Sequence, residues 1–213
     1  QEALYRSVAR TEGGPILAAC RDRNASIPYL HTFHVLTMLK QICDHPAIYY
    51  RRPADYQSME SGKFTLFREI LCNALNSGEK IAVFSQFLRM IDIIALELET
   101  MGAGYVRLTG STVERGAVIA EFNRNPECRV FVGSLKAGGS GIDLTAAGVL
   151  IHYDRWWNAA REDQATDRVH RIGQRKTVQI IKMTTSGTIE ERIDRIIERK
   201  RVLSQEALSV DDP

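Results

Sequence analysis

Long apolar runs, prolines and net charge are all scarce in this chain. Its 213 residues contain no stretch near the roughly 18 consecutive apolar residues that a membrane-spanning helix needs. The opening residues, QEALYRSVAR, lack the basic, apolar and small-residue order of a secretory signal. With 44% hydrophobic residues and only 6 prolines, the composition is that of an ordinary globular protein. We therefore expect a soluble, intracellular protein, cytoplasmic in a bacterium or nuclear in a eukaryote.

Cysteine is also sparse, and its spacing argues against both disulfides and zinc. The 4 cysteines form no C-x-x-C pair, and a chain with a large core does not require disulfides. One region gathers four possible zinc ligands: His31, His34, Cys43 and His45. Structural zinc sites usually pair their ligands at tighter, repeated spacings. We therefore expect buried free thiols and no metal site.

Net charge is small overall but unevenly distributed. The chain carries a formal net charge of +2, whereas residues 155–201 hold 12 lysines and arginines against 7 aspartates and glutamates. A basic segment of this kind either contacts phosphate groups or forms the solvated surface of a helix. Charge alone leaves both interpretations open.

Apolar runs alternate with helical patterns beyond about residue 60. The runs cover residues 81–84, 105–108, 130–132, 149–153 and 178–183, and helical patterns occupy residues 87–101, 113–122, 158–172 and a segment that opens at residue 188. Short apolar strands joined by helices predict a parallel sheet buried on both faces, with right-handed crossovers. We predict an α/β fold, a doubly wound parallel sheet flanked by helices, over residues 61–213.

A helical segment is expected ahead of that sheet. Apolar residues recur at the spacing of one helix face over residues 30–42, and the helix should end before His45-Pro46 because a residue before proline disfavours the helical conformation. Residues 51–62 lack periodicity and read as a linker. We assign residues 1–60 to an N-terminal helical linker segment, with a domain boundary near residue 60.

The last predicted helix has a start signal and two faces. Thr188 and Glu191 stand in the S/T-x-x-E spacing of a capping box. Isoleucines at positions 189, 193, 196 and 197 form a predicted apolar stripe, and basic residues follow at positions 192, 195, 199, 200 and 201. This pattern favours a helix packed on the sheet with a solvated back, and a nucleic-acid-facing helix is the alternative.

The helix expected over residues 158–172 places two arginines on one stripe. Gln164, Arg168 and Arg171 follow the i, i+4, i+7 spacing, beside an apolar stripe at positions 165, 169 and 172. Guanidinium groups are always protonated and fork onto phosphate oxygens, so such a pair can neutralise a γ-phosphoryl group in transfer. Taken alone, the spacing favours surface arginines paired with Asp163 and Asp167.

A glycine cluster follows the strand predicted at residues 130–132. In GSLKAGGSGIDL, the cluster of Gly138, Gly139 and Gly141 would let backbone amides approach a phosphate or ribose closely. The loop is neither G-x-G-x-x-G nor a Walker A loop. Taken alone, it favours a tight turn over a nucleotide contact.

These segments occur with further motifs in one order along the chain. The motifs are SGKF, IAVFSQF, LTGSTVERGAVIAEFN, VFVGSLKAGGSGIDLTAAGVLIHYDRWWN and DQATDRVHRIGQRKTVQI, preceded by QEALYRSV and LKQICDHP. In this order they resemble motifs IV to VI of the second RecA-like lobe of Swi/Snf-type DNA translocases, a branch of the superfamily 2 helicases. The resemblance covers about residues 61–200. It implies a RecA-like fold and makes residues 1–60 the segment that leads from a first lobe.

The resemblance assigns roles to individual residues. It implies that Arg168 and Arg171 are arginine fingers that reach ATP on the first lobe, and that Gln164 contacts the nucleotide or couples it to the nucleic acid. The loop on the ribose side of ATP would contain Gly139, Gly141 and Asp143. Contacts with duplex DNA, made to phosphates without reading sequence, are implied for Ser85, Gln86, Thr109, Gly110, Ser134, Lys136, Trp157 and Asn158. Trp156, Trp157 and Asn158 would link the two sites.

Several of these residues could instead have purely structural roles, and three positions differ from the family pattern. Trp157 is equally a candidate core residue, and hydroxyls at strand ends also cap turns, as those of Ser85, Thr109 and Ser134 could. Three positions depart from the family pattern: Leu135 replaces a usual Thr, Asp143 a frequent Asn, and Ala159 a common Pro. The departures bear on the DNA contacts and leave the arginine pair untouched.

Half of a nucleotide site is absent from these 213 residues. They contain no G-x-x-x-x-G-K-[ST] loop and no Asp-Glu pair after a strand to hold Mg²⁺. Arginine fingers accelerate hydrolysis only where a phosphate cradle and a metal ion are present. We therefore expect ATP and Mg²⁺ to be held mainly by a first RecA-like lobe of a DNA-dependent ATPase, and this chain alone to be inactive.

Three functional hypotheses follow. The first is a motor lobe of an ATP-dependent translocase or remodeller on double-stranded DNA, whose target is a nucleoprotein or a DNA-bound protein. The second is a non-catalytic lobe that docks DNA or protein. The third is a helicase that separates RNA or DNA strands, which the Swi/Snf-like signature and the lack of an obvious strand-splitting wedge weaken.

Overall fold

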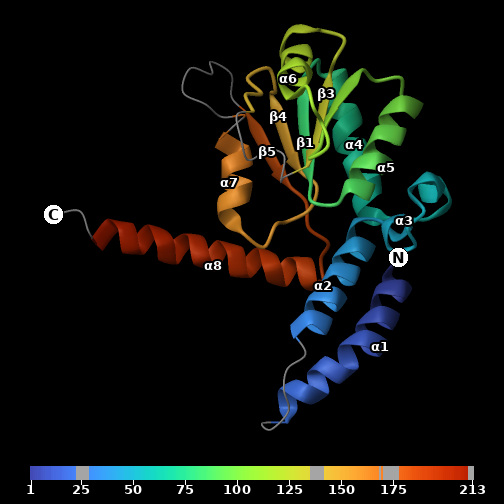
Figure 1. The fold of residues 1–213 in the computed structure, drawn as a ribbon, viewed down its shortest axis with the longest axis vertical. Helices are drawn as coiled ribbons and strands as arrows, with labels where there is room; N and C mark the ends of the chain where they lie inside the picture. Colours follow the sequence, from blue (N-terminus) through green and yellow to red (C-terminus); the bar gives the residue numbers. More distant parts are fainter. Residues whose placement is uncertain (23–28, 135–141, 168, 170–177, 211–213) are drawn as a thin grey trace.

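The computed structural model describes residues 1–22, 29–134, 142–167, 169 and 178–210. The fold is built on a five-stranded sheet in the order β2-β3-β1-β4-β5 (Figure 1). The strands are β1 Ile81–Ser85, β2 Tyr105–Leu108, β3 Val130–Ser134, β4 Val149–His152 and β5 Gln179–Lys182. Each neighbouring pair is parallel. The predicted α/β fold with a parallel sheet is confirmed.

Three strands form the interior of the sheet because they are apolar on both faces. Every residue of β1, β3 and β4 is buried. Side chains alternate between faces along a strand, so Ile81 and Val83 of β1 lie in one apolar cluster and Ala82 and Phe84 lie in another. The strands β2 and β5 lie at the two edges and are partly exposed. Continuous apolar runs are what a sheet covered on both faces requires.

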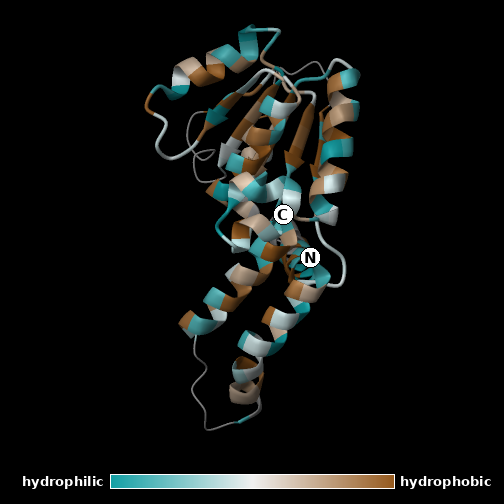
Figure 2. Cartoon of the chain, turned by 90° about the vertical axis from the view of Figure 1, so that its right-hand side faces the viewer, coloured by the Kyte–Doolittle hydropathy of each residue, from teal (hydrophilic) through white to brown (hydrophobic). Residues whose placement is uncertain are grey.

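Helices cover both faces of the sheet. On the face of Val83 lie α4 (Gly62–Asn76) and α5 (Leu88–Thr100), and on the face of Phe84 lie α6 (Arg115–Arg124) and α7 (Ala159–Asp167). Figure 2 shows apolar colour concentrated on the strands between these helices. The sequence patterns above do not include α4, which begins after Ser61, whose Oγ accepts a hydrogen bond from the Phe64 amide.

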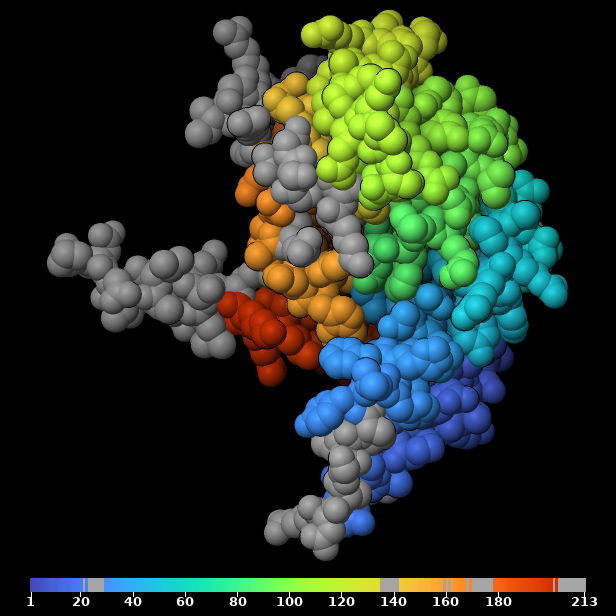
Figure 3. Space-filling model, in the orientation of Figure 1, coloured from blue at the N-terminus to red at the C-terminus, as the bar shows by residue number. Residues whose placement is uncertain are grey.

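Four elements precede α4: α1 (Glu2–Arg21), α2 (Tyr29–Asp44), α3 (Pro46–Tyr49) and the 3₁₀ helix η1 (Pro53–Ser58). The first two pack against each other and extend away from the sheet (Figures 1 and 3). As predicted, α2 ends before Pro46. Residues 51–62, interpreted as a linker, contain η1, and Tyr56 within it is buried in the apolar cluster of α4 and α5.

The C-terminal helix α8 (Ile189–Val210) begins beside α2 and runs below α7 (Figure 1). Its start is capped by Thr188 Oγ1, which accepts from the Glu190 amide, and by Glu191, which accepts from the Gly187 amide. These amides differ from the pair in a capping box. In the described part of the chain, no helix has both the length and the apolar character needed to cross a bilayer.

The apolar stripe predicted on α8 is wrong at one position, Ile196. Ile193 and Ile197 are each 1% exposed, whereas Ile196 is 50% exposed. Successive residues of an α-helix differ by about 100° in direction, so Ile196 lies well off the line that joins positions 193 and 197. The packed face of α8 is therefore narrower than predicted.

The four cysteines are free, as predicted, but only two of them are buried. Cys43 and Cys128 are buried, whereas Cys20 and Cys72 are exposed. Cys72 follows the buried Leu71 on α4, and a step of about 100° turns it from the core. The prediction of four buried thiols is therefore wrong for half of them.

A buried cluster of ion pairs joins α2, α4 and α8. Lys63 Nζ lies 2.9 Å from Asp44 Oδ1 and 2.6 Å from Glu190 Oε1, and the three side chains are at most 2% exposed. The Tyr153 hydroxyl donates to the Asp44 carbonyl at 2.9 Å. Removing one member of a buried ion cluster leaves an uncompensated charge. This cluster therefore fixes the helical segment and the C-terminal helix to the sheet.

Candidate nucleic-acid and nucleotide interface

The carboxyl ends of the strands bring together three residues predicted to contact DNA. Ser85, the last residue of β1, is the register partner of Ser134, the last residue of β3. Thr109 directly follows β2, which is the other neighbour of β3. Because the strands are parallel, these residues lie along one edge of the sheet, and ligands of doubly wound sheets bind beyond this edge. The fold therefore assembles a site from residues far apart in sequence.

The hydroxyl of Ser85 points inward at this edge. Ser85 is fully buried, and its Oγ donates to Asp154 Oδ2 at 2.5 Å and accepts from the Phe87 amide at 3.2 Å. The Gln86 amide donates to the same Asp154 carboxylate at 3.2 Å. Ser85 thus shapes the turn after β1, as strand-end hydroxyls can. Its contact with DNA stays a prediction.

The side-chain amide of Gln86 has an unpaired hydrogen-bond donor. Its Nε2 is buried and has no hydrogen-bond partner among the described residues. An unsatisfied buried donor costs free energy that an incoming acceptor can recover. This donor is unpaired but buried, so the contact of Gln86 with DNA stays a prediction.

The turn after β2 presents backbone and not the predicted hydroxyl. Thr109 is buried, its amide donates to Thr112 Oγ1, and its Oγ1 hydrogen-bonds to Ser111 Oγ, both at 2.9 Å. Gly110 is exposed, with open space where a Cβ would lie. Ser134 is buried like Thr109. Gly110 is therefore the member of the predicted set that a phosphate can approach most directly at this turn.

Two charged residues after β4 connect the sheet edge to two helices. Arg155 is 2% exposed, and its Nε donates to Glu162 Oε1 of α7 at 3.0 Å. The same guanidinium pairs with Asp194 and Glu198 of α8. Asp154, which precedes it, holds the turn after β1. Sequence reasoning missed both residues, although a charged pair directly after the apolar run VLIHY is a signal that could have found them.

Burial determines the electrostatics of this edge. Burial raises the pKa of Asp154 above its ordinary value, while the charge of Lys40 and the hydrogen bond from Ser85 oppose that rise. Burial lowers the pKa of His152 to about 4. His152 is therefore neutral at pH 7, and its Nε2 lies 3.2 Å from Thr166 Oγ1.

The predicted apolar stripe at positions 165, 169 and 172 is buried at its first two positions, and the third lies outside the described residues. Ala165 and Val169 are buried in the cluster of Phe84 and Phe122. Gln164 is half-buried on the neighbouring stripe. The position of Gln164 outside the packed face is consistent with its predicted contact with a nucleotide.

The segment before α7 is held by two hydrogen bonds. Asn158 Oδ1 accepts from the Ala160 amide at 3.1 Å, and the Trp156 amide donates to Glu162 Oε1 at 2.7 Å. A side-chain oxygen that accepts from an amide two residues on caps the helix start. Asn158 therefore has a structural role at α7 in addition to its predicted contact with DNA.

The two tryptophans of this segment differ in burial. Trp156 is half-buried against the cluster that contains Phe122, whereas Trp157 is 42% exposed. The Nζ of Lys40, from α2, lies 5.7 Å from the Trp157 ring centroid. Trp157 is thus a surface residue with one contact to a cation, and its exposed part is accessible to a ligand.

Five predicted residues lie outside the described residues, namely Arg168, Arg171, Gly139, Gly141 and Lys136. Their roles stay predictions. Asp143, predicted on the ribose side of the nucleotide, is described and half-buried, and its carbonyl accepts from Asn123 Nδ2 at 2.7 Å.

The four residues considered as zinc ligands do not converge. His31 and Cys43 lie near opposite ends of α2, so a rise of about 1.5 Å per residue separates them by about 18 Å. His45 Nδ1 accepts from the Ala47 amide. The described residues contain no group of three or more His, Cys, Asp or Glu side chains able to hold a metal ion.

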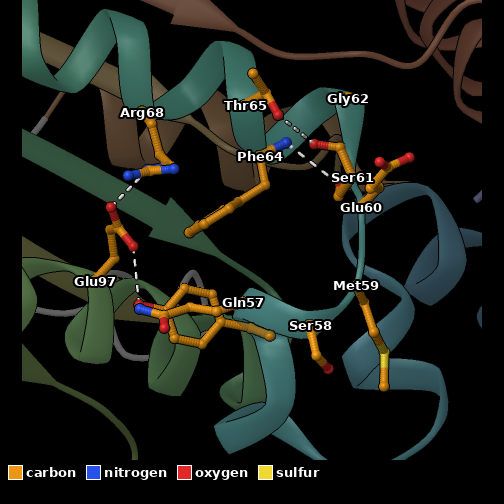
Figure 4. A pocket seen from close by; sticks show the side chains of 11 residues that line it. Gln57, Ser58, Met59, Glu60, Ser61, Gly62, Phe64, Thr65, Arg68 and Glu97 are labelled. Atoms are coloured by element: carbon orange, nitrogen blue, oxygen red, sulfur yellow. Dashed lines mark hydrogen bonds and ion pairs between the residues drawn. The ribbon is translucent and has the colours of Figure 1, made fainter.

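A pocket of about 760 Å³ lies between η1, the start of α4 and α5 (Figure 4). Its buried carboxylate, Glu97, already pairs with Arg68 Nε at 2.6 Å and accepts from the Tyr56 hydroxyl at 2.9 Å. None of the predicted site residues lines the pocket. We assign it no function.

Known proteins share this fold and its motifs. YwqA of Bacillus subtilis (strain 168), a candidate ATP-dependent helicase/translocase, is 42% identical over 178 residues, which cover 82% of this chain and 19% of that protein. The human SWI/SNF-related matrix-associated actin-dependent regulator of chromatin subfamily A containing DEAD/H box 1 is 42% identical, covering 72% of this chain and 15% of that protein. The Sulfolobus solfataricus SWI2/SNF2 ATPase core in complex with dsDNA matches with a TM-score of 0.75 at 36% identity, covering 99% of this chain and 43% of that chain.

The family profile of the helicase conserved C-terminal domain matches residues 62–173. The chain therefore belongs to the helicase C-terminal domain family, and within it to the second lobe of SWI2/SNF2 ATPases of superfamily 2. It spans less than a fifth of the length of the two relatives above.

Proposed function

We propose that this chain is the second motor lobe of an ATP-dependent translocase that acts on double-stranded DNA. The observation that carries the proposal is the convergence of Ser85, Thr109 and Ser134 on one sheet edge, joined to α7 through Arg155 and Glu162. A DNA-facing edge and a nucleotide-facing helix are thus mechanically connected in one lobe. The Sulfolobus relative in complex with dsDNA supports the choice of duplex DNA.

The DNA contacts in this proposal are directed at the phosphate backbone. Gly110 offers exposed backbone, Gln86 has an unpaired donor that is buried in the absence of DNA, and Trp157 offers a partly exposed ring. Contacts of this kind hold position without reading sequence. Lys136 and Asn158 complete the proposed set of DNA contacts. The substrate on which the motor acts is a nucleoprotein or a DNA-bound protein.

The nucleotide contacts in this proposal come from α7, from residues that follow it in the sequence and from the glycine-rich loop. Arg168 and Arg171 act as arginine fingers, Gln164 contacts the nucleotide, and Gly139 and Gly141, with Asp143, approach the ribose. ATP and Mg²⁺ are held mainly by a first RecA-like lobe of the parent protein. The chain alone hydrolyses ATP negligibly, because arginine fingers act only on a phosphoryl group that is already held.

The test is Arg171→Ala in the protein that contains both lobes. Removal of an arginine finger costs about 10³- to 10⁵-fold in hydrolysis, so kcat of DNA-stimulated ATP hydrolysis should fall by at least about 1,000-fold. DNA affinity, measured by fluorescence anisotropy of a labelled duplex, should stay within about twofold because a finger faces ATP and not DNA.

The matched control is Arg199→Ala, which removes an exposed arginine from α8 and should leave hydrolysis unchanged. Unchanged hydrolysis in Arg171→Ala would contradict the finger assignment. Duplex binding without any DNA-stimulated hydrolysis in the unaltered protein would favour the docking lobe instead.

A further inference from the structure

Helix α2 buries a lysine beneath the candidate interface. Lys40 is 1% exposed, although lysine is almost never fully buried unless it is paired. Its Nζ donates to the Arg155 carbonyl at 2.5 Å. The same Nζ lies 6.0 Å from the Phe87 ring centroid and 5.7 Å from that of Trp157. One ammonium group thus contacts the segments that follow β1 and β4.

The contacts of Lys40 lead to three residues of the interface. The Arg155 carbonyl immediately precedes Trp156 and Trp157, so its hydrogen bond fixes the backbone from which Trp157 projects. The charge of Lys40 also stabilises the ionised Asp154 carboxylate against burial. That carboxylate in turn accepts from the Ser85 hydroxyl and the Gln86 amide.

We infer that Lys40 is a positioning residue that holds Trp157 and the turn after β1 in place from helix α2, without itself contacting DNA. The inference rests on the proposed function in one respect, namely that this edge binds DNA. It adds that the helical segment before the sheet controls how the edge is presented. Without the ammonium group, the Arg155 carbonyl loses its buried donor and the Asp154 carboxylate loses a positive charge that stabilises its ionised form.

The first test uses Trp157 fluorescence in this chain. The chain contains 2 tryptophans, so Trp156→Phe leaves Trp157 as the sole indole. In that background, Lys40→Met should red-shift the emission and raise the acrylamide quenching constant by up to about twofold, because the ring loses its contact with the ammonium group and is already 42% exposed. Lys200→Met, which removes an exposed lysine from α8, is the matched control and should change neither. Unchanged emission and quenching in Lys40→Met would overturn the inference.

The second test separates positioning from simple stability. In the protein that contains both lobes, Lys40→Met should raise the DNA concentration for half-maximal ATPase stimulation about fivefold, with KM for ATP within about twofold, because α7 is held by Arg155 and not by Lys40. Lys40→Arg keeps the charge and the donors and should restore most of the DNA response. A lowered unfolding midpoint with an unchanged DNA response in Lys40→Met would show a structural role only and overturn the inference.

Failure of the proposed function and failure of the inference about Lys40 give different experimental results. Absence of DNA-stimulated hydrolysis in the unaltered protein would defeat the proposed function, while the Trp157 measurement would still decide the contact of Lys40. If Lys40→Met does not fold, Asp154→Asn replaces it, since this change keeps the shape and removes the charge that Lys40 stabilises. Asp154→Asn should shift Trp157 quenching and the DNA response in the same direction, and no change in either would overturn the inference.

Discussion

At the scale of single residues, the interface depends on charges that are buried and paired. Arg155 connects the sheet edge to α7 and α8, and Lys63 joins α2, α4 and α8. A buried ion pair contributes little net stability relative to an apolar replacement of both partners, but the loss of one partner is costly. These residues therefore matter through the geometry that they impose on neighbouring elements.

Lys63→Met is expected to destabilise the chain by about 3–5 kcal/mol, since Asp44 and Glu190 would remain buried without their cation. Urea denaturation followed by circular dichroism measures the change. Lys200→Met, an exposed substitution on α8, should stay within about 0.5 kcal/mol of the unaltered chain. A loss below about 1 kcal/mol in Lys63→Met would show that the cluster relaxes or admits water.

His152 should make stability depend on pH. Burial lowers its pKa to about 4 in the folded chain, whereas an unfolded histidine titrates near pH 6.5. The unfolded state therefore binds more protons between these values, so stability rises with pH across this window and is lost as pH falls. Between pH 7 and pH 5 the loss attributable to His152 is about 2 kcal/mol.

The pH dependence is measured by urea denaturation at a series of pH values. His152→Gln should remove this part of the loss, and the exposed His34→Gln should keep it. His45, whose pKa is also lowered to about 4 by burial, should sustain a further loss in both variants. An equal pH dependence in His152→Gln and the unaltered chain would contradict the assignment.

At the scale of elements, the packed face of each helix decides which residues remain for ligands. The burial of Ala165 on α7, and of Val169 beyond its end, leaves Gln164 outside the packed face. On α8, the packed face is narrow because Ile193 and Ile197 are buried and Ile196 is not. A solvated face that carries arginines is thus compatible with a helix that packs firmly on its other side.

Ile193→Ala and Ile196→Ala form a matched pair on α8. Ile193→Ala should destabilise the chain by about 2–5 kcal/mol because it leaves a cavity in the core. Ile196→Ala should stay within about 0.5 kcal/mol because its side chain is half exposed. Urea denaturation of both variants measures the difference, and equal losses would place both side chains in the same environment.

At the scale of the whole molecule, one sheet supports two proposed functions on different segments. The strand ends form one continuous edge, and Arg155 connects that edge to α7. The helical segment before the sheet is joined to the C-terminal helix through Lys63. Both terminal segments are therefore joined to the sheet through buried contacts.

The salt dependence of DNA binding should identify which cations contact phosphate. Most of the proposed DNA-contacting residues are uncharged, so Lys136→Ala should weaken binding uniformly across sequences and reduce the slope of log affinity against log salt by about 1. Fluorescence anisotropy at several salt concentrations measures this slope. Lys200→Ala tests the alternative that α8 faces the nucleic acid, and an equal reduction in that variant would support it.

The strands were predictable because their signal is local. Each observed strand lies within two residues of its predicted bounds, since a continuous apolar run reports burial on both faces. The helix α4 was not predicted, and its lysine became interpretable only when Asp44 and Glu190 were seen beside it. The hydroxyls of Ser85 and Thr109 were placed correctly along the chain, but only the fold showed that both are buried.

The sequence by itself determined where the strands and several of the helices lie along the chain, the parallel sheet and the family, because apolar periodicity and short motifs are properties of neighbouring residues. Only the tertiary structure decided which charges meet. Lys40 and Arg155 are 115 positions apart, and Lys63 and Glu190 are 127 positions apart. A side chain becomes a partner of such a distant residue only when the packing of the whole sheet and its helices brings the two together and removes water from between them.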